Sequence, residues 1–162
     1  MMKLILFRHG IAEDRRPDLS DADRALTAQG VDRTTRAAGG LAKLAGGQVD
    51  VVLTSPKVRA RQTAELVGAA LGLAPIELPV LADGPTEAIA DALAGRPEGV
   101  VVAVGHEPHL SEVVERLCFG EARGRVAMKK AGAACIQTSG RPGPGSCELA
   151  WLATGRMLRK IG

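Results

Sequence analysis

Two histidines stand beside glycines at the ends of apolar runs, where their chemistry would be accessible. Arg8, His9 and Gly10 follow one run, and Gly105 with His106 follows another. An arginine beside a histidine combines a fork for anions with a nucleophile or base that works near neutral pH. We expect Gly10 to let the chain turn sharply and let a substrate approach the backbone. Taken alone, the triplet at 8–10 is also typical of an ordinary charged strand end, and His106 of a histidine with a structural role.

Two more basic residues lie just inside a predicted helix that opens at Ser55-Pro56. A serine followed by a proline is a favourable N-cap and first-turn pair. The start of a helix favours phosphate, and an arginine near it adds a bidentate grip. Arg59 and Arg61 are two residues apart and therefore face different ways on a helix. We expect at most one of them to reach a site there.

A metal centre is an alternative use of the second histidine. His106 and His109 are the only close pair of histidines, and Pro108 lies between them. A zinc site needs at least three protein ligands, and no third ligand is apparent. We therefore expect neither a metal nor another cofactor.

Strands and helices alternate in the part of the chain that positions these residues. Apolar runs predict strands over 3–7, 50–54, 76–78 and 100–104, with helices over 27–45, 55–72, 86–95 and from 108 onward. Strands over 133–138 and 147–152 flank a Gly/Pro-rich loop and are expected to form an antiparallel hairpin. This order predicts a three-layer α/β/α fold with a mainly parallel sheet. Ligands bind beyond the carboxyl ends of such strands, so 8–10, 55–56 and 105–106 should share one rim.

Length and composition limit the class of protein. The chain has 162 residues, which fits a single domain over 1–162, since domains cluster at roughly 100–200 residues. No apolar run approaches the roughly 18 residues of a membrane span, and the first run is too short for a signal peptide, so we expect a cytoplasmic protein. A net charge of +3 and 2% aromatic residues fit an anionic substrate, and argue against a nucleic-acid or membrane partner.

Four motifs occur together in one order along the chain. They read LFRHG at 6–10, LTAQG at 26–30, SPKVRARQTA at 55–64 and VGHEP at 104–108. With them the chain resembles the histidine phosphatase superfamily, and in particular its short branch of SixA-type phosphohistidine phosphatases. The resemblance extends over nearly the whole sequence and implies a phosphoglycerate-mutase-like fold.

The resemblance implies a role for each basic residue of the motifs. His9 is the nucleophile that takes the phosphoryl group, Arg8 and Arg59 bind phosphate oxygens, and His106 completes the pocket. Arg24, just ahead of the second motif, matches an arginine of the short branch that lies over the phosphate; the alternative is a surface charge on a loop.

One feature of larger relatives is missing, namely the insertion that carries a carboxylic general acid. Only a short stretch separates Gly72 from Thr86, and Asp83 and Glu87, in or near it, match no motif. Other candidates are Glu13, Asp14 and Glu107, and none is assigned as the acid. The sequence thus predicts a metal-independent phosphatase with a covalent phosphohistidine intermediate, acting on phosphohistidine in a protein. The alternatives are a broader small-molecule phosphomonoesterase and a phosphoryl-binding module without turnover.

Overall fold

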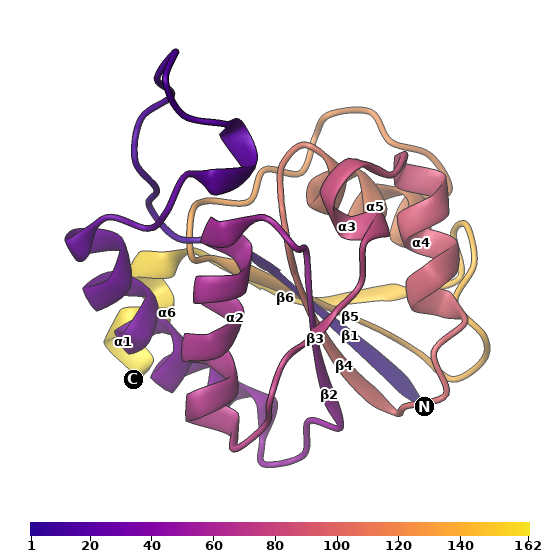
Figure 1. The fold of residues 1–162 in the computed structure, drawn as a ribbon. Coiled ribbons are helices and arrows are strands. Elements are labelled where there is room, and N and C mark those ends of the chain that lie inside the picture. Colours follow the sequence, from indigo (N-terminus) through magenta and orange to yellow (C-terminus); the bar gives the residue numbers. More distant parts are fainter.

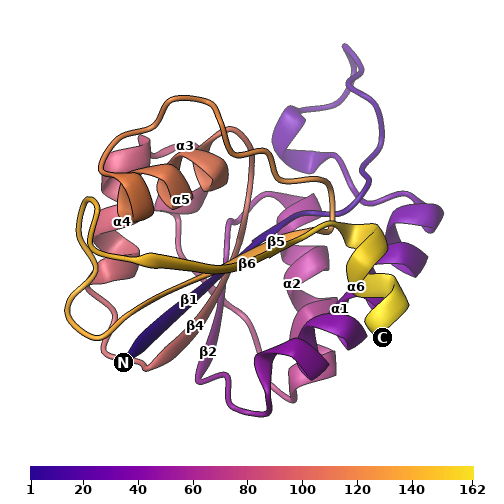
Figure 2. The ribbon, with the colours of Figure 1, turned by 180° about the vertical axis from the view of Figure 1, so that it is seen from behind.

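A computed structural model describes all 162 residues (Figures 1 and 2). The helices and strands, in chain order, are β1 Met2–Arg8, the 3-10 turn η1 Asp21–Asp23, α1 Ala28–Ala45, β2 Val51–Thr54, α2 Val58–Leu71, β3 Ile76–Glu77, α3 Val80–Asp83, α4 Thr86–Ala94, β4 Val100–Gly105, α5 His109–Phe119, β5 Ala133–Thr138, β6 Glu148–Ala153 and α6 Gly155–Ile161. None of these helices combines the length and the hydropathy that crossing a lipid bilayer requires.

A six-stranded sheet runs through the middle of the molecule in the order β3-β2-β4-β1-β5-β6. β1, β2, β3 and β4 pair in parallel, whereas β5 is antiparallel to both β1 and β6. Helices α1, α2 and α6 lie on one face of the sheet, and α3, α4 and α5 lie on the other (Figures 1 and 2). The predicted three-layer α/β architecture and its C-terminal antiparallel hairpin are confirmed.

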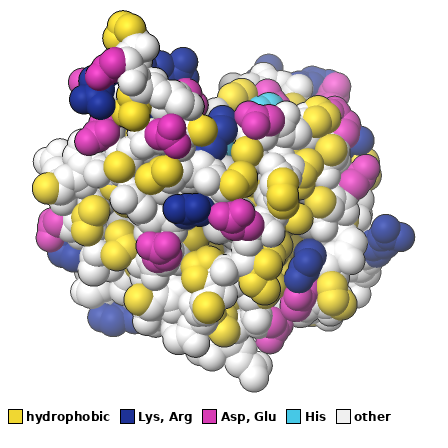
Figure 3. All heavy atoms as spheres, viewed as in Figure 1, with side chains coloured by type: hydrophobic (Ala, Val, Ile, Leu, Met, Phe, Trp, Pro, Cys, Tyr) yellow, Lys and Arg dark blue, Asp and Glu magenta, His cyan; other side chains and the backbone are white.

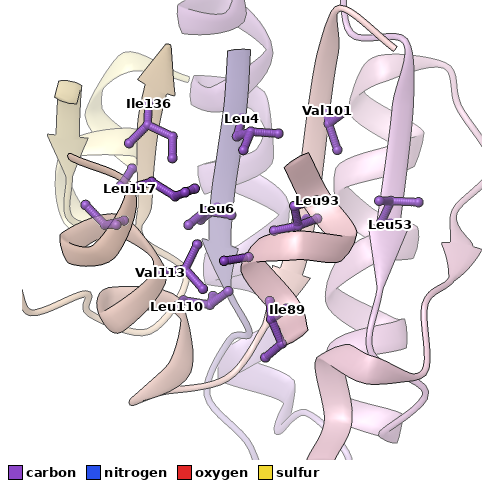
Figure 4. Close-up of a cluster of buried hydrophobic side chains, with 14 of the residues drawn as sticks. Leu4, Leu6, Leu53, Ile89, Leu93, Val101, Leu110, Val113, Leu117 and Ile136 are labelled. Carbon is purple, nitrogen blue, oxygen red and sulfur yellow. The ribbon is translucent and has the colours of Figure 1, made fainter. Parts of the chain in front are cut away.

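The sheet is buried on both faces, which explains why its central strands are apolar without alternation. On one face, side chains of β1, β2, β4 and β5 pack against α4 and α5; the largest include Leu6, Ile89, Leu93, Leu110 and Leu117 (Figure 4). On the other face, Phe7 and Val104 pack against the small residues of α1 and α2. This burial holds β1 and β4 rigidly, and both strands end at the rim where the predicted site lies.

Of two predicted helix starts, the one at Thr27 is confirmed and the one at Ser55-Pro56 is wrong. The Thr27 side chain accepts the N–H of Gly30 and caps α1, and Gly46 ends that helix with a φ of 69°, as predicted. The prediction that Ser55-Pro56 caps the next helix is wrong, because α2 begins only at Val58. The hydroxyl of Ser55 accepts the N–H of Lys57 just ahead of the helix, and it also contacts a side chain of the site.

A further helix, α6, follows β6 and was not predicted. It packs along α1 on the outer side of the sheet (Figure 2). Gly40 on α1 makes this approach possible, since a Cβ there would lie 1.9 Å from the carbonyl oxygen of Leu158. Thr154 caps α6 by accepting the N–H of Met157.

Candidate active site

Three strand ends meet at one rim of the sheet. Arg8 lies opposite Gly105 in the parallel register of β1 and β4, so His9 and His106 follow side by side. Their ring centroids are 5.2 Å apart. Ser55 follows β2, and its N–H donates to the carbonyl of Val104 over 3.1 Å. Figure 3 shows histidine and basic side chains in the recess between the projecting loop and the lobe of α3 to α5.

His9 is held in one orientation by contacts to both ring nitrogens. Its Nδ1 lies 2.7 Å from the carbonyl oxygen of Gly10, and a carbonyl can only accept, so Nδ1 carries the proton. The Nε–H of Arg59 points at His9 Nε2 over 3.4 Å, which fits a bare lone pair there. Burial, together with the charges of Arg59, Arg8 and Lys130, outweighs the Gly10 contact and lowers the pKa of His9 to about 4. The ring is therefore neutral at pH 7.

His106 faces His9 across the pocket with one nitrogen in use. Its Nε2 lies 2.8 Å from the hydroxyl of Ser55, while its buried Nδ1 has no hydrogen-bond partner. Burial, then the charges of His9 and Arg59, lowers the pKa of His106 to about 3. An unpartnered ring nitrogen beside a nucleophile is available to an oxygen of a bound anion.

Two arginines lie beside His9. Arg59 is only 4% exposed, and besides His9 it donates to the backbone carbonyl of Asp21 over 2.7 Å. Arg8 donates to the carbonyl of Met128 over 2.9 Å, while its buried Nε has no partner. Arg61, on the same helix as Arg59, points away and lies 3.6 Å from Glu77 at the surface. The structure thus brings Arg59, and not Arg61, into the site.

The loop between β1 and α1 contributes a carboxylate that the sequence did not single out. Asp21 receives Arg59 Nη2 at 3.1 Å and Arg24 Nε at 3.0 Å. Partial burial opposes its ionisation, but these hydrogen bonds lower the pKa of Asp21 to about 2. Arg24 also donates to the carbonyl of Glu13, so it borders the site through Asp21 and not through His9.

Three further polar residues support the site. Lys57 lies 3.8 Å from Asp21. Thr63 accepts the N–H of Gly10 over 3.1 Å and donates to the carbonyl of Arg59 over 2.7 Å. Ser55, Lys57 and Thr63 all fall within the third motif, so the signal was present, but their side-chain partners depend on tertiary contacts.

The structure explains the glycine at position 10 differently from the predicted sharp turn. Its φ is not positive, so it makes no turn that only glycine allows. A Cβ on Gly10 would lie 2.1 Å from the hydroxyl of Thr34 on α1. The absence of a side chain lets the strand end pack directly against that helix.

The carboxylates considered as proton donors are engaged elsewhere. Glu107 accepts the backbone N–H of Ser111. Asp83 and Glu87 have side chains 85% and 62% exposed, paired with Lys57 and Arg116 respectively. None of these groups, nor Glu13 or Asp14, forms a hydrogen bond with either site histidine.

His109 does not join His106. Its Nδ1 lies 3.2 Å from the hydroxyl of Thr86. No three side chains of His, Cys, Asp or Glu converge anywhere in the chain as a metal-binding group.

Comparisons with known proteins agree with this geometry. The sequence profile of the histidine phosphatase superfamily (branch 1) matches residues 4–127. The chain is 42% identical to an uncharacterised protein of Picosynechococcus sp. over 136 residues, covering 81% of this chain and 82% of that one. It is 34% identical over 127 residues to phosphohistidine phosphatase SixA of Escherichia coli, covering 74% and 76%.

Comparison with solved structures also finds similarity to a SixA protein. The structure of the protein histidine phosphatase SixA complexed with tungstate superposes with a TM-score of 0.78 at 27% identity, covering 96% of this chain and 98% of that one. The chain belongs to the histidine phosphatase superfamily, branch 1. Within that family it is a SixA-like phosphatase.

Proposed function

We propose that this chain is a metal-independent phosphatase that carries the phosphoryl group on His9, with phosphohistidine in a protein as its substrate. The His9 ring carries the proposal: Gly10 holds the proton on Nδ1, and Nε2 is left as a lone pair facing Arg59. A neutral imidazole is a nucleophile, and covalent transfer divides one hard displacement into two easier ones.

The first step forms a bond from His9 Nε2 to phosphorus while the bond from phosphorus to the leaving group breaks. In the second step water attacks phosphorus, the nitrogen–phosphorus bond breaks, and the proton of water leaves with the phosphate product. Phosphoryl transfer needs mainly positioning and positive charge around the oxygens. The guanidinium groups of Arg8 and Arg59 supply that charge without a metal, while the ring of His106 is neutral and keeps its Nδ1 uncommitted to any protein group. We place Arg24 in an outer position, where it orients Asp21 and Arg59.

The choice of substrate follows from the carboxylates. An alkoxide leaving group has a conjugate acid near the pKa of water, about 15.7, and needs a proton donor. Asp21 is ionised at neutral pH and cannot supply that proton, while Glu107 is bound to Ser111. The leaving imidazole of phosphohistidine can carry a proton on its other nitrogen and needs no enzymic acid. The similarity to phosphohistidine phosphatase SixA supports the same substrate.

The cysteines bear on the compartment. Three free thiols, at Cys118, Cys135 and Cys147, fit a reducing cytoplasm.

A leaving-group series tests the proposal. With metal chelated, we expect a phosphohistidine peptide and an activated aryl phosphate to be hydrolysed well. Alkyl phosphates should show a kcat/KM at least ~10²-fold lower, since general acid catalysis contributes about 10²–10⁴-fold. A flat dependence on leaving-group pKa would favour a broader phosphomonoesterase, and no turnover of any substrate would indicate a binding module.

Rapid quench with labelled substrate locates the intermediate. The label should appear, acid-labile and base-stable, on the peptide that contains His9, and His9→Ala should lower kcat/KM by at least ~10³-fold. A label on His106 or His109 would reverse the assignment.

A further inference from the structure

A basic hollow lies beside the active site, on the side of the sheet covered by α1 and α6. Its volume is about 510 Å³. Six cationic side chains line it, drawn from the end of β1, from α1, from the segment before β5 and from α6: Arg8, Arg33, Lys129, Lys130, Arg156 and Arg159. No carboxylate lines it. We call this feature the basic hollow.

The cations of the basic hollow are not paired with carboxylates in salt bridges. None of the six cations takes part in a salt bridge, whereas most of the other arginines in the chain do. Burial, and then the charges of Arg33, Arg36 and Arg156, lowers the pKa of Arg159, and the nearby carboxylate of Asp32 only partly opposes this. The whole chain has a net charge of only +3. The basic hollow therefore concentrates unbalanced positive charge in one place.

The hollow is joined to the catalytic rim through a backbone segment held in place. The N–H of Ala131 donates to the carbonyls of Arg8 and His9 over 3.1 and 3.2 Å. Ala131 has a φ of 54°, a left-handed conformation that costs an alanine energy and persists only where its surroundings impose it. These contacts hold Lys129 and Lys130 next to the nucleophile, and Lys130 is near enough to lower the pKa of His9.

The lining of the hollow indicates which class of ligand fits. Apolar small molecules bind in pockets lined mainly by hydrophobic side chains, whereas only Ile11 and Ala131 are hydrophobic here. In the proposed mechanism Arg8 and Arg59 serve the phosphate at His9, which leaves the other five cations of the hollow without a role there. Six cations on four segments match several negative charges spread along a chain.

We propose that the basic hollow binds an acidic segment of the protein substrate while the phosphorylated residue of that substrate enters at His9. This inference rests on the proposed function, and it names the feature of the protein that the enzyme selects. The acidic segment neutralises the cations, and Arg8 connects the two sites because it lines the hollow and precedes the nucleophile.

A binding experiment tests the hollow without relying on the reaction. The probe is an unphosphorylated peptide with a run of glutamates, titrated calorimetrically at low and at high salt. In the hollow variant Arg33, Arg156 and Arg159 are changed to Gln, which leaves Arg8 and the rest of the catalytic site intact. An exposed ion pair is worth about two- to fivefold in affinity, so we expect the loss of three cations to weaken binding by about tenfold to about 100-fold. Salt should weaken wild-type binding as well.

A matched control has the same net charge as the hollow variant. It carries Arg61→Gln, Arg125→Gln and Arg141→Gln, all outside the hollow, and it should bind the glutamate peptide as the wild type does. Equal loss in the control would show general charge attraction and overturn the proposal. Three other results would also overturn the proposal. They are no binding of the glutamate peptide to the wild type, equally tight binding of that peptide to the hollow variant, and binding of inorganic tripolyphosphate without binding of the peptide.

A kinetic comparison then separates the hollow from the proposed function. Two phosphohistidine peptides are compared, one flanked by glutamates and one by glutamines, with an aryl phosphate as the measure of chemistry. We expect the wild type to favour the glutamate peptide about tenfold in kcat/KM, and the hollow variant to lose that preference with unchanged aryl phosphate turnover. Equal kcat/KM for the two peptides in the wild type would refute the hollow's role. Turnover of the aryl phosphate but of neither peptide would instead refute the proposed function.

Discussion

Lowering the pH from 6 to 5 should destabilise this protein through its two site histidines. Burial lowers the pKa of His9 from 6.5 to about 4 and that of His106 from 6.5 to about 3. In this window the unfolded chain binds protons at both residues and the folded chain does not. Stability is therefore complete above pH 6.5 and falls as the pH drops below it.

The size of the effect follows from proton linkage. A group protonated only in the unfolded state changes the free energy of unfolding by about 1.4 kcal/mol per pH unit. With both unfolded histidines mostly protonated, we expect the protein to lose about 2 kcal/mol between pH 6 and pH 5. That is a large part of a typical total of about 5–15 kcal/mol. His9→Gln and His106→Gln should each reduce the loss by about 1 kcal/mol.

Urea denaturation at several pH values measures this slope. The comparison uses the change with pH and not the absolute stability, so any general effect of a glutamine cancels. Carboxylates and His109 are present in every variant and cancel too. If the slope of His9→Gln equals that of the wild type, the ring is not held neutral, and the argument for a neutral nucleophile fails.

Two further predictions test individual contacts. Arg59→Lys should lower kcat/KM on an aryl phosphate by about 10²–10³-fold, because a preorganised donor is worth about 2.7–4 kcal/mol and an ammonium cannot form the fork; the exposed Arg61→Lys serves as the control and should change little. Gly10→Ala should destabilise the fold by about 1–3 kcal/mol through overpacking against Thr34. Thr34→Ala should restore most of that loss in the double variant, as denaturant midpoints would show; strict additivity of the two changes would contradict the packing argument.

Much of the fold was predictable because local patterns and tertiary burial agree. Each apolar run became a strand, and the four inner strands β1, β2, β4 and β5 are largely buried. The rule that parallel strands end at one edge predicted that 8–10, 55–56 and 105–106 share one rim, and His9, Ser55 and His106 do lie together there. Helix geometry predicted that at most one of Arg59 and Arg61 reaches the site, since side chains two positions apart face different ways. The choice of Arg59 came from the resemblance to the family.

What the sequence did not reveal depends on contacts between distant segments. Asp21 lies in a polar loop with several acids, and only the folded loop brings it to Arg59 and Arg24. The hydroxyl of Ser55 accepts the N–H of Lys57, as its local sequence favours, and it also contacts His106. The local pattern could not reveal this second, tertiary hydrogen bond.

The charges around His9 serve two purposes that follow from the same electrostatics. Arg8, Arg59 and Lys130 disfavour a proton on His9 and thereby keep its lone pair free. The same positive charges attract the anion that this lone pair attacks. Asp21 offsets only part of this positive charge. Its carboxylate is shared between Arg24 and Arg59, and it contacts the Nη2 atom of Arg59, whereas the His9 ring contacts the Nε atom. A site with more carboxylates would bind phosphate less well and would leave the imidazole easier to protonate, so the scarcity of acids supports both the nucleophile and its substrate.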